Sequence, residues 1–137
     1  MAEVPRVGVG ILILKNRQIL LGLRKGSHAA GTWAAPGGHL EFGETFEGCA
    51  LREIDEEIGD VCVQNIRFAT ASGDLYPDVG RHYITILMVA DYVSGEPENK
   101  EPEKCEEWRW FSPAELPENL FPALQSIFGR GFDPFAT

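Results

Sequence analysis

Residues 45–58 carry apolar side chains at every fourth position. These side chains are Phe46, Ala50, Ile54 and Ile58. Because each residue of an α-helix is rotated by about 100° from the one before it, this spacing predicts a helix with a single apolar stripe. Thr45 suits the N-cap of this helix, and Gly59 suits the position after its end. Such a helix must bury its stripe against another layer, so it restricts the chain to layered folds.

Two pairs of β-rich segments flank this helix. Residues 6–24 form two apolar runs with Asn16 in the turn between them. Residues 61–76 and 81–93 form two more, around a turn in which Pro77 suits the second position. The β-branched and aromatic content of these runs is typical of strands. We therefore expect two β-hairpins, one before the helix and one after it.

A glycine pair and a further strand and helix complete the pattern. Gly37 and Gly38 follow Pro36, and we expect a turn there because glycine adopts backbone angles that other residues avoid. We expect a last strand at residues 108–111 and a second helix at residues 119–128. The order of strands, helix, strands and helix predicts an α+β fold in which at least one helix packs on a mixed sheet.

The chain has 137 residues, a length typical of one domain. We therefore expect residues 1–137 to form a single domain. The acidic segment 94–107 contains several prolines, and we interpret it as a surface loop because too little chain follows it to build a second domain. The three cysteines are widely spaced and contain no C-x-x-C pair, so the sequence suggests neither a disulfide framework nor a zinc site.

The charge of the chain limits its partners. Twelve basic and 21 acidic residues give a net charge of −9, the wrong sign for a protein that binds polymeric nucleic acid through phosphates. No apolar run approaches the roughly 20 residues that cross a membrane. The N-terminal residues lack the basic region and cleavage site of a signal peptide, so we expect a cytoplasmic protein. The sequence leaves open whether the chain forms a homodimer.

Three glutamates share one face of the predicted helix. Glu53, Glu56 and Glu57 are spaced i, i+3 and i+4, and like charges at these spacings repel one another. Divalent cations with a preference for oxygen ligands reverse the sign of that interaction, because the carboxylates can converge on one ion. A solvated surface rich in glutamate is the alternative interpretation of the same spacing.

The spacing of these residues matches a known signature. Gly38, Glu44 and the run from Arg52 to Gly59 resemble the Nudix box, G-x(5)-E-x(7)-R-E-U-x-E-E-x-G-U, in which U is a bulky aliphatic residue. Every fixed polar and glycine position is present, and Asp60 stands where the closing aliphatic residue is expected. The segments PGGHLEFGE, HYITILM, EPEKCEEW and GFDPF are similar to a subgroup of small nucleotide diphosphatases that act on thiopurine or oxidised nucleotides.

This resemblance implies a fold and an activity. The fold is a Nudix-type α/β/α sandwich around a mixed β-sheet. The activity is the Mg²⁺-dependent cleavage of nucleoside triphosphates or modified nucleotides to the monophosphate and pyrophosphate, with Mn²⁺ as an alternative ion. The partner is then a small-molecule nucleotide. Two alternatives remain: hydrolysis of another nucleoside-diphosphate-linked compound, such as ADP-ribose, NADH or a dinucleoside polyphosphate, and a non-catalytic nucleotide sensor.

The resemblance also assigns roles to residues. The implied metal ligands are the carbonyl of Gly37 and the side chains of Glu53, Glu56 and Glu57. Glu53 is the first candidate to orient or deprotonate water, with Glu56 able to share that role. Arg52 and Glu44 are expected to pair and to fix the ligand side chains.

The predicted substrate contacts come from several segments. They are Arg24, Lys25, Gly38, His39, Thr85, Leu87, Glu103 and Phe135. Glu101, Glu103 and Glu106 in the acidic loop are further candidates for a metal ligand or a base. For each of these residues an ordinary structural role, either packing or a solvated charge, is the alternative.

Overall fold

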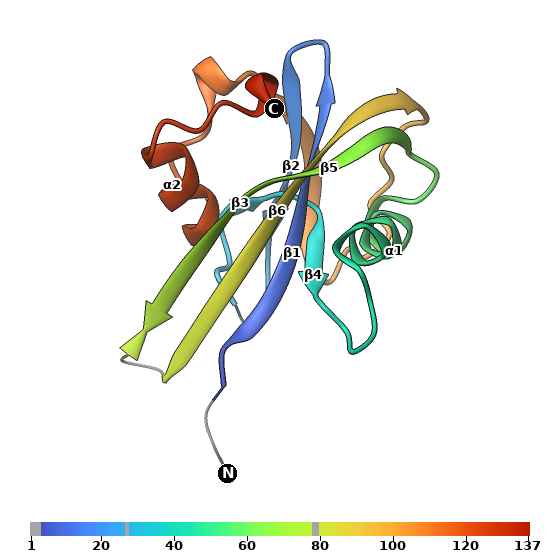
Figure 1. Cartoon of the computed structure of the whole chain (residues 1–137). Coiled ribbons are helices and arrows are strands. Elements are labelled where there is room, and N and C mark those ends of the chain that lie inside the picture. The colour runs from blue at the N-terminus through green and yellow to red at the C-terminus, as the bar shows by residue number, and fades with distance from the viewer. Residues whose placement is uncertain (1–3, 27, 78–79) are drawn as a thin grey trace.

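The computed structural model describes residues 4–26, 28–77 and 80–137 (Figure 1). Its strands are β1 Arg6–Lys15, β2 Gln18–Arg24, β3 Trp33–Ala34, β4 Gly37–His39, β5 Cys62–Tyr76, β6 Arg81–Ser94 and β7 Cys105–Phe111. Its α-helices are α1 Phe46–Ile58 and α2 Pro122–Gly129, and its short 3-10 helices include η2 Pro113–Glu115 and η3 Pro134–Ala136.

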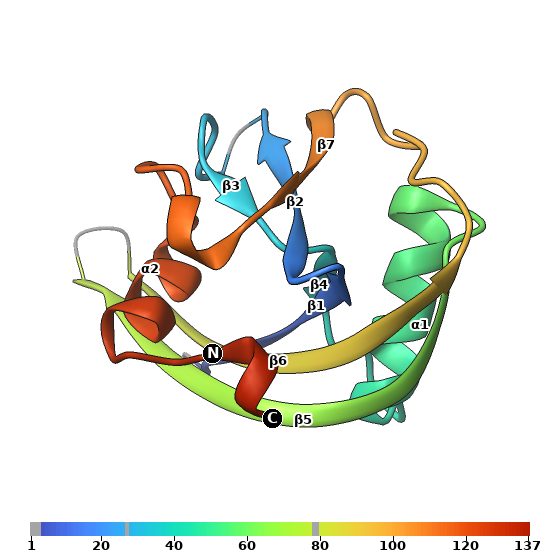
Figure 2. The ribbon, with the colours of Figure 1, turned by 90° about the horizontal axis from the view of Figure 1, so that it is seen from above.

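The strands form one mixed sheet. Its main path runs β3-β2-β1-β6-β5, while β4 pairs with β1 and β7 pairs with β2. The pairing of β1 with β6 is parallel, and the other strand pairs of the described residues are antiparallel. Both predicted hairpins are present, as β1–β2 and β5–β6, and the second is long and strongly curved (Figure 2).

The two α-helices lie on opposite sides of the sheet (Figure 1). Because successive side chains of a strand point to opposite faces, β1 sends Val9, Ile11 and Ile13 into the cluster under α1 and Leu12 into the cluster under α2. The same alternation divides β6, where Ile86 belongs to the first cluster and Leu87 to the second. The predicted α/β/α sandwich is confirmed.

The predicted helix α1 is also confirmed. Its N-cap is Thr45, whose hydroxyl accepts a hydrogen bond from the N–H of Gly48 at 2.9 Å. Gly59 follows its end with φ 79°, a value that favours glycine. The apolar stripe differs in one position, because Phe46 remains 39% exposed and the buried stripe begins one turn later, at Cys49 and Ala50.

The predicted turn at the glycine pair is wrong. Gly37 and Gly38 lie in β4, paired with Gly10 and Val9 of β1, and neither has a positive φ. Glycine is needed there for close approach instead. A Cβ on Gly37 would lie 2.8 Å from the Cα of Gly10, and the carbonyl oxygen of Val9 would be closer still.

The later part of the chain departs from prediction mainly in its boundaries. Strand β7 begins at Cys105 rather than at residue 108, and α2 begins at Pro122 rather than at residue 119. In the turn after β5, the N–H of Gly80 donates to the carbonyl of Pro77, which makes Pro77 the first rather than the second residue. Asp78 and Val79 lie outside the described residues. No helix in the described part of the chain is both long enough and apolar enough to cross a membrane.

Candidate active site

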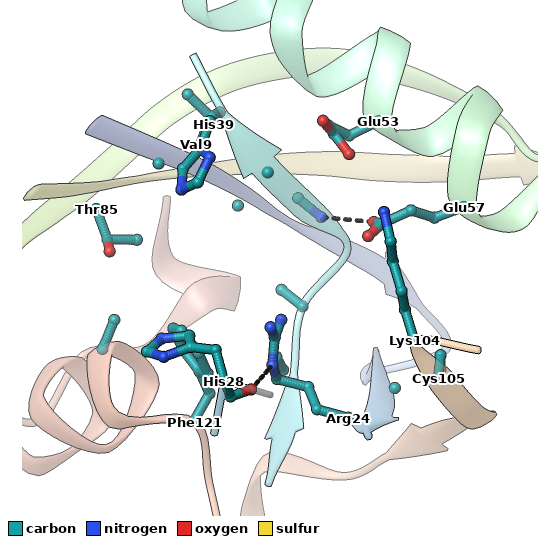
Figure 3. A pocket seen from close by; sticks show the side chains of 18 of the residues that line it. Val9, Arg24, His28, His39, Glu53, Glu57, Thr85, Lys104, Cys105 and Phe121 are labelled. Atoms are coloured by element: carbon teal, nitrogen blue, oxygen red, sulfur yellow. Dashed lines mark hydrogen bonds between the residues drawn. The ribbon is translucent and has the colours of Figure 1, made fainter. Parts of the chain in front are cut away.

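A cleft of about 770 Å³ opens between the two helical layers (Figure 3). Its walls come from β1, β2, β4, β5 and β6, from α1 and α2, and from the loop before β7 with the start of that strand. It brings together these predicted site residues: Arg24, Lys25, Gly37, Gly38, His39, Arg52, Glu53, Glu56, Glu57, Thr85, Leu87 and Glu103. Segments that are far apart in the sequence therefore converge on one cavity.

The cleft has two chemically different ends (Figure 3). At one end lie Glu53, Glu57 and Lys104. At the other lie His28, His39, Thr85 and Phe121. Arg24 lies between them, and its Nε donates to the carbonyl of His28 at 3.1 Å. We call these the carboxylate end and the ring end.

Helix α1 supplies the carboxylate end. Glu53 is 9% exposed and lies against Gly38 of β4, where a Cβ would stand 2.6 Å from the Cδ of Glu53. Glu57 accepts a hydrogen bond from the N–H of Gly37 at 2.8 Å. Burial raises the pKa of both carboxyl groups, that of Glu57 to about 8. The glycine pair therefore lets α1 bring two carboxylates up to the backbone of β4.

Arg52 binds several of these carboxylates. Its Nε and one terminal nitrogen donate to the two oxygens of Glu44 at 2.7 and 2.9 Å, which is a bidentate pair. The other terminal nitrogen donates to Glu53 at 2.8 Å and to Glu56 at 3.4 Å. The hydrogen bonds from Arg52, with one from the N–H of Glu41, lower the pKa of Glu44 to about 2. The pair predicted between Arg52 and Glu44 is present.

The donor atoms at this end suit a hard divalent cation, because carboxylate oxygens are the ligands that such ions prefer. Within the described residues, however, no three acidic, histidine or cysteine side chains converge closely enough to hold a metal ion. The hydrogen bonds of the three glutamates explain why their carboxylates do not converge. Arg52 holds Glu53 and Glu56, while Glu57 is held by the backbone of β4. These contacts hold the three carboxylates to different partners.

The acidic loop before β7 is fixed to both walls of the cleft. The N–H groups of Glu98 and Lys100 donate to the carbonyls of Ile58 and Glu57, at the end of α1, at 3.0 and 3.2 Å. The carbonyl of Lys104 accepts from the N–H of Lys25, just after β2, at 3.0 Å. This loop consequently has an ordered path across the cleft.

The path of the loop determines which of its three predicted acidic residues reach the cleft. Glu101 and Glu103 line the cleft, whereas Glu106 is exposed on β7 and lies outside it. Burial is the main cause of the raised pKa values of Glu53 and Glu57, and the charge of Glu101 adds to both. Glu101 is therefore a further carboxylate in the neighbourhood of Glu53 and Glu57.

The ring end contains residues that the sequence did not identify. The ring of Tyr83 lies 5.6 Å from His28, 6.3 Å from Tyr76 and 6.4 Å from His39, and its plane is nearly parallel to that of His39. Phe121 lies 5.9 Å from His28. His28, a loop residue, joins this cluster. Because the rings come from five separate segments, no local motif indicates them.

Phe135 does not reach the cleft. It lies in η3, packs against the cluster under α2, and has the guanidinium of Arg17 at 4.9 Å from its ring centroid. It lines a second cavity of about 580 Å³. Arg17 is in the turn before β2 and Arg24 is at the far end of β2, so this cavity and the cleft lie at opposite ends of that strand. The prediction that Phe135 contacts substrate in the cleft is therefore not supported.

Comparison with known proteins gives a consistent result. The family model described as the NUDIX domain matches residues 4–129. A NAD-capped RNA hydrolase NudC from Photobacterium profundum is 36% identical over 118 residues, which are 85% of this chain and 42% of that protein. An ADP-ribose pyrophosphatase from Methanocaldococcus jannaschii is also 36% identical over 118 residues, which are 85% of this chain and 68% of that protein. The chain thus spans less than half the length of the first relative.

A solved structure is similar over nearly the full length of both chains. It is a MutT NUDIX hydrolase from Burkholderia pseudomallei, 34% identical, with a TM-score of 0.81, and the match covers 87% of this chain and 92% of that one.

Proposed function

The chain belongs to the Nudix hydrolase family, and from this premise we propose that it hydrolyses nucleoside triphosphates or modified nucleotides to the monophosphate and pyrophosphate. The observation that carries the proposal is the division of one cleft into a carboxylate end and a ring end with Arg24 between them. A nucleotide has the same division, with a flat base at one end and phosphates at the other. The base then lies at the ring end and the phosphates extend toward α1.

The proposal includes a divalent metal ion, with Mg²⁺ preferred and Mn²⁺ as an alternative. Glu53, Glu56, Glu57 and the carbonyl of Gly37 would hold it. When bound, such an ion neutralises phosphate charge and lowers the pKa of water. This contribution matters for a chain with net charge −9, since its own charges would repel the substrate.

The side chains of the protein position the reacting groups. Arg24 is held by the carbonyl of His28, and its guanidinium lies 5.2 Å from the ring centroid of Phe121, so it enters the cleft in a fixed orientation. Burial lowers the pKa of Arg24, but an arginine remains charged at neutral pH and can donate to a phosphate oxygen.

Glu53 is the first candidate to orient water or accept its proton. Its carboxylate is fixed between Arg52 and the backbone of Gly38, and its pKa is raised by burial. A raised pKa moves a carboxylate toward the range in which a general base is effective. Glu56 and Glu101 can share this role, because both lie at the same end of the cleft.

Incubation with Mg²⁺ or Mn²⁺ and a nucleotide panel tests the proposal. The panel contains the common ribo- and deoxynucleoside triphosphates and an oxidised deoxynucleotide, and the products are separated by ion-exchange chromatography. We expect the monophosphate and pyrophosphate. If every member is bound but none is turned over with either metal, the chain is a nucleotide sensor instead. Release of orthophosphate would show that a different bond is broken.

A second candidate is the hydrolysis of a nucleoside diphosphate linked to another group. The relatives named ADP-ribose pyrophosphatase and NAD-capped RNA hydrolase favour it. ADP-ribose would give AMP and ribose 5-phosphate, and NAD would give AMP and nicotinamide mononucleotide. Adding both compounds to the panel separates the candidates. The acidic charge of the chain favours small nucleotides over polymeric RNA in either case.

A further inference from the structure

Three neighbouring strands form the floor of the ring end. Arg6 of β1 is in register with Tyr83 of β6, and Tyr83 is in register with Asp74 of β5. Side chains of register partners on adjacent strands project from the same face of a sheet. All three residues line the cleft. The floor therefore presents a cation, a ring and a carboxylate in one row.

The next row of the floor leaves space above the sheet. Thr85 of β6 lies between Gly8 of β1 and Ser72 of β5. A Cβ on Gly8 would meet its nearest neighbour, a backbone oxygen, at 3.8 Å, so this position has room for a side chain but carries none. A flat ligand can lie over this part of the floor with one edge toward Asp74.

Two hydroxyl groups fix the orientation of Asp74. Ser72 donates to its Oδ2 at 2.9 Å, and Ser126 of α2 donates to its Oδ1 at 3.2 Å. The side chain is half-buried, and the ion pairs of the described residues do not include it. An ionised carboxylate has about four lone-pair sites on its two oxygens. Asp74 therefore keeps acceptor capacity on both oxygens after binding the two serines.

We propose that Asp74 determines base specificity by accepting hydrogen bonds from two adjacent N–H groups, which selects a guanine-type base. This inference rests on the proposed function, because it assumes that the base enters the ring end. A carboxylate repels phosphate, so the group that meets Asp74 must be a hydrogen-bond donor. Both the base edge and the ribose hydroxyls of a nucleotide offer such donors. We assign the base edge to Asp74 because the neighbouring rings of Tyr76 and Tyr83 line the same part of the cleft and suit a flat base.

The common bases differ in the donors that they offer. Guanine presents its N1–H and its 2-amino group side by side, and this pair matches the two oxygens of a carboxylate. Adenine and cytosine present one amino group next to an acceptor nitrogen, and uracil presents one N–H between two carbonyls. These three leave one carboxylate oxygen facing an acceptor or without a partner, which is costly in a partly desolvated site. An oxidised guanine keeps the same pair of donors if only its imidazole ring is changed.

A pair of substrates that differ in one group tests the inference. ITP lacks the 2-amino group of GTP and is otherwise the same, so the ratio of their kcat/KM values isolates that group. We expect GTP to be preferred by on the order of tenfold or more, as for a bidentate contact to a base. In Asp74→Asn the ratio should fall toward one, mainly through a loss on GTP. A wild-type ratio near one, a preference for ATP, or an unchanged ratio in the variant would each overturn the inference.

Asp60→Asn is the matched control, because it removes one carboxylate charge from an exposed position outside the cleft. It should leave the GTP to ITP ratio unchanged. If Asp74→Asn does not fold, Ser126→Ala provides the second test, since it removes one of the two bonds that orient Asp74. The ratio should then fall by a smaller factor, and an unchanged ratio would contradict the role of Asp74.

Binding measurements separate this inference from the proposed function. If neither triphosphate is turned over, the proposed function fails, and calorimetric titration with GMP and IMP still decides the role of Asp74. Tighter binding of GMP by the wild type, lost in Asp74→Asn, supports the inference. Equal binding of GMP and IMP by the wild type refutes it.

Discussion

Gly38 lies in contact with the carboxylate of Glu53, with no space between them for a side chain. Glu53 comes from α1 and Gly38 from β4, so this contact sets the distance between the helix and the strand at the carboxylate end. The contact makes the glycine pair part of the site geometry, even though both glycines have ordinary strand conformations.

Gly38→Ala should displace Glu53 and lower activity by about 100-fold, the effect expected for a displacement of about 1 Å near the reacting groups. The protein should still fold, because Glu53 can rotate away from the new methyl group. Steady-state kinetics and a thermal melt measure the two effects. Gly73→Ala is the control, since a Cβ on Gly73 of β5 would meet no atom within 4 Å. Full activity of Gly38→Ala would show that the contact is not needed.

Glu57→Gln should keep the fold and lower activity by orders of magnitude, because it removes a charged metal ligand and leaves an isosteric amide next to Gly37. It should also abolish the rise in melting temperature that Mg²⁺ causes in the wild type, where an ion at about 100 times its Kd adds roughly 2.7 kcal/mol. Asp55→Asn, on an exposed position of the same helix, should behave like the wild type. An active Glu57→Gln enzyme would contradict the assignment.

Metal binding should strengthen as the pH rises toward 8. Burial raises the pKa of Glu57 to about 8, so an ion must displace a proton below that pH, and the apparent affinity should fall by up to about tenfold per pH unit. Calorimetric titration with Mg²⁺ in buffers of different ionisation enthalpy measures both the affinity and the proton released. Affinity that does not change between pH 6 and pH 8 would exclude Glu57 as the titrating ligand.

The same shift predicts the pH dependence of metal-free stability. The folded-state pKa of Glu57 lies above its unfolded value, so the folded state binds the proton more tightly. Its contribution to the free energy of unfolding is complete below the unfolded pKa and is lost as the pH rises through about 8. Melting temperatures from pH 5 to pH 9 should therefore decline more in the wild type than in Glu57→Gln. Parallel curves for the two proteins would contradict the shift.

Arg52→Lys should lower kcat by about ten- to hundredfold, as is typical when a residue that orients metal ligands is changed. A lysine keeps the charge but cannot form the bidentate pair with Glu44 while also donating to Glu53. The pKa of Glu44 should rise from about 2 toward its usual range, which carboxyl NMR titration measures. Arg109→Lys, which changes an exposed pair with Glu107, is the control. An unchanged kcat would show that charge alone is sufficient.

The carboxylate end could be predicted from the sequence because its residues are close together in the chain. Helical spacing places Glu53, Glu56 and Glu57 on neighbouring turns, and the same spacing places Arg52 beside them. The resemblance placed the carbonyl of Gly37 near these carboxylates, but the prediction did not include the hydrogen bond from Gly37 to Glu57 or the contact between Gly38 and Glu53. A Gly-Gly pair is compatible with a turn and also with the close approach of another backbone or side chain. Which of the two occurs depends on the strand that lies beside the pair, and the sequence does not show that strand.

The ring end could not be predicted in the same way. His28 and Phe121 are each separated by tens of residues from Tyr76 and Tyr83, and each of the four alone is an ordinary aromatic or loop residue. The register between β5 and β6 and the position of α2 bring them together, and neither is encoded in a short motif. Phe135 shows the converse case, since it lies in the segment GFDPF that the resemblance singled out but packs against Arg17, in the turn before β2.

The hydrogen bonds from Glu98 and Lys100 to the end of α1 join two segments that are about 40 residues apart in the chain. The last turn of α1 cannot fray without breaking them, and the loop cannot lift without exposing the carbonyls of Glu57 and Ile58. The helix end and the loop should therefore open as one cooperative unit. Native-state hydrogen exchange should give the amides of Glu98 and Lys100 the same opening free energy, whereas independent opening would give them different values. Motion of the loop is in this way coupled directly to Glu57.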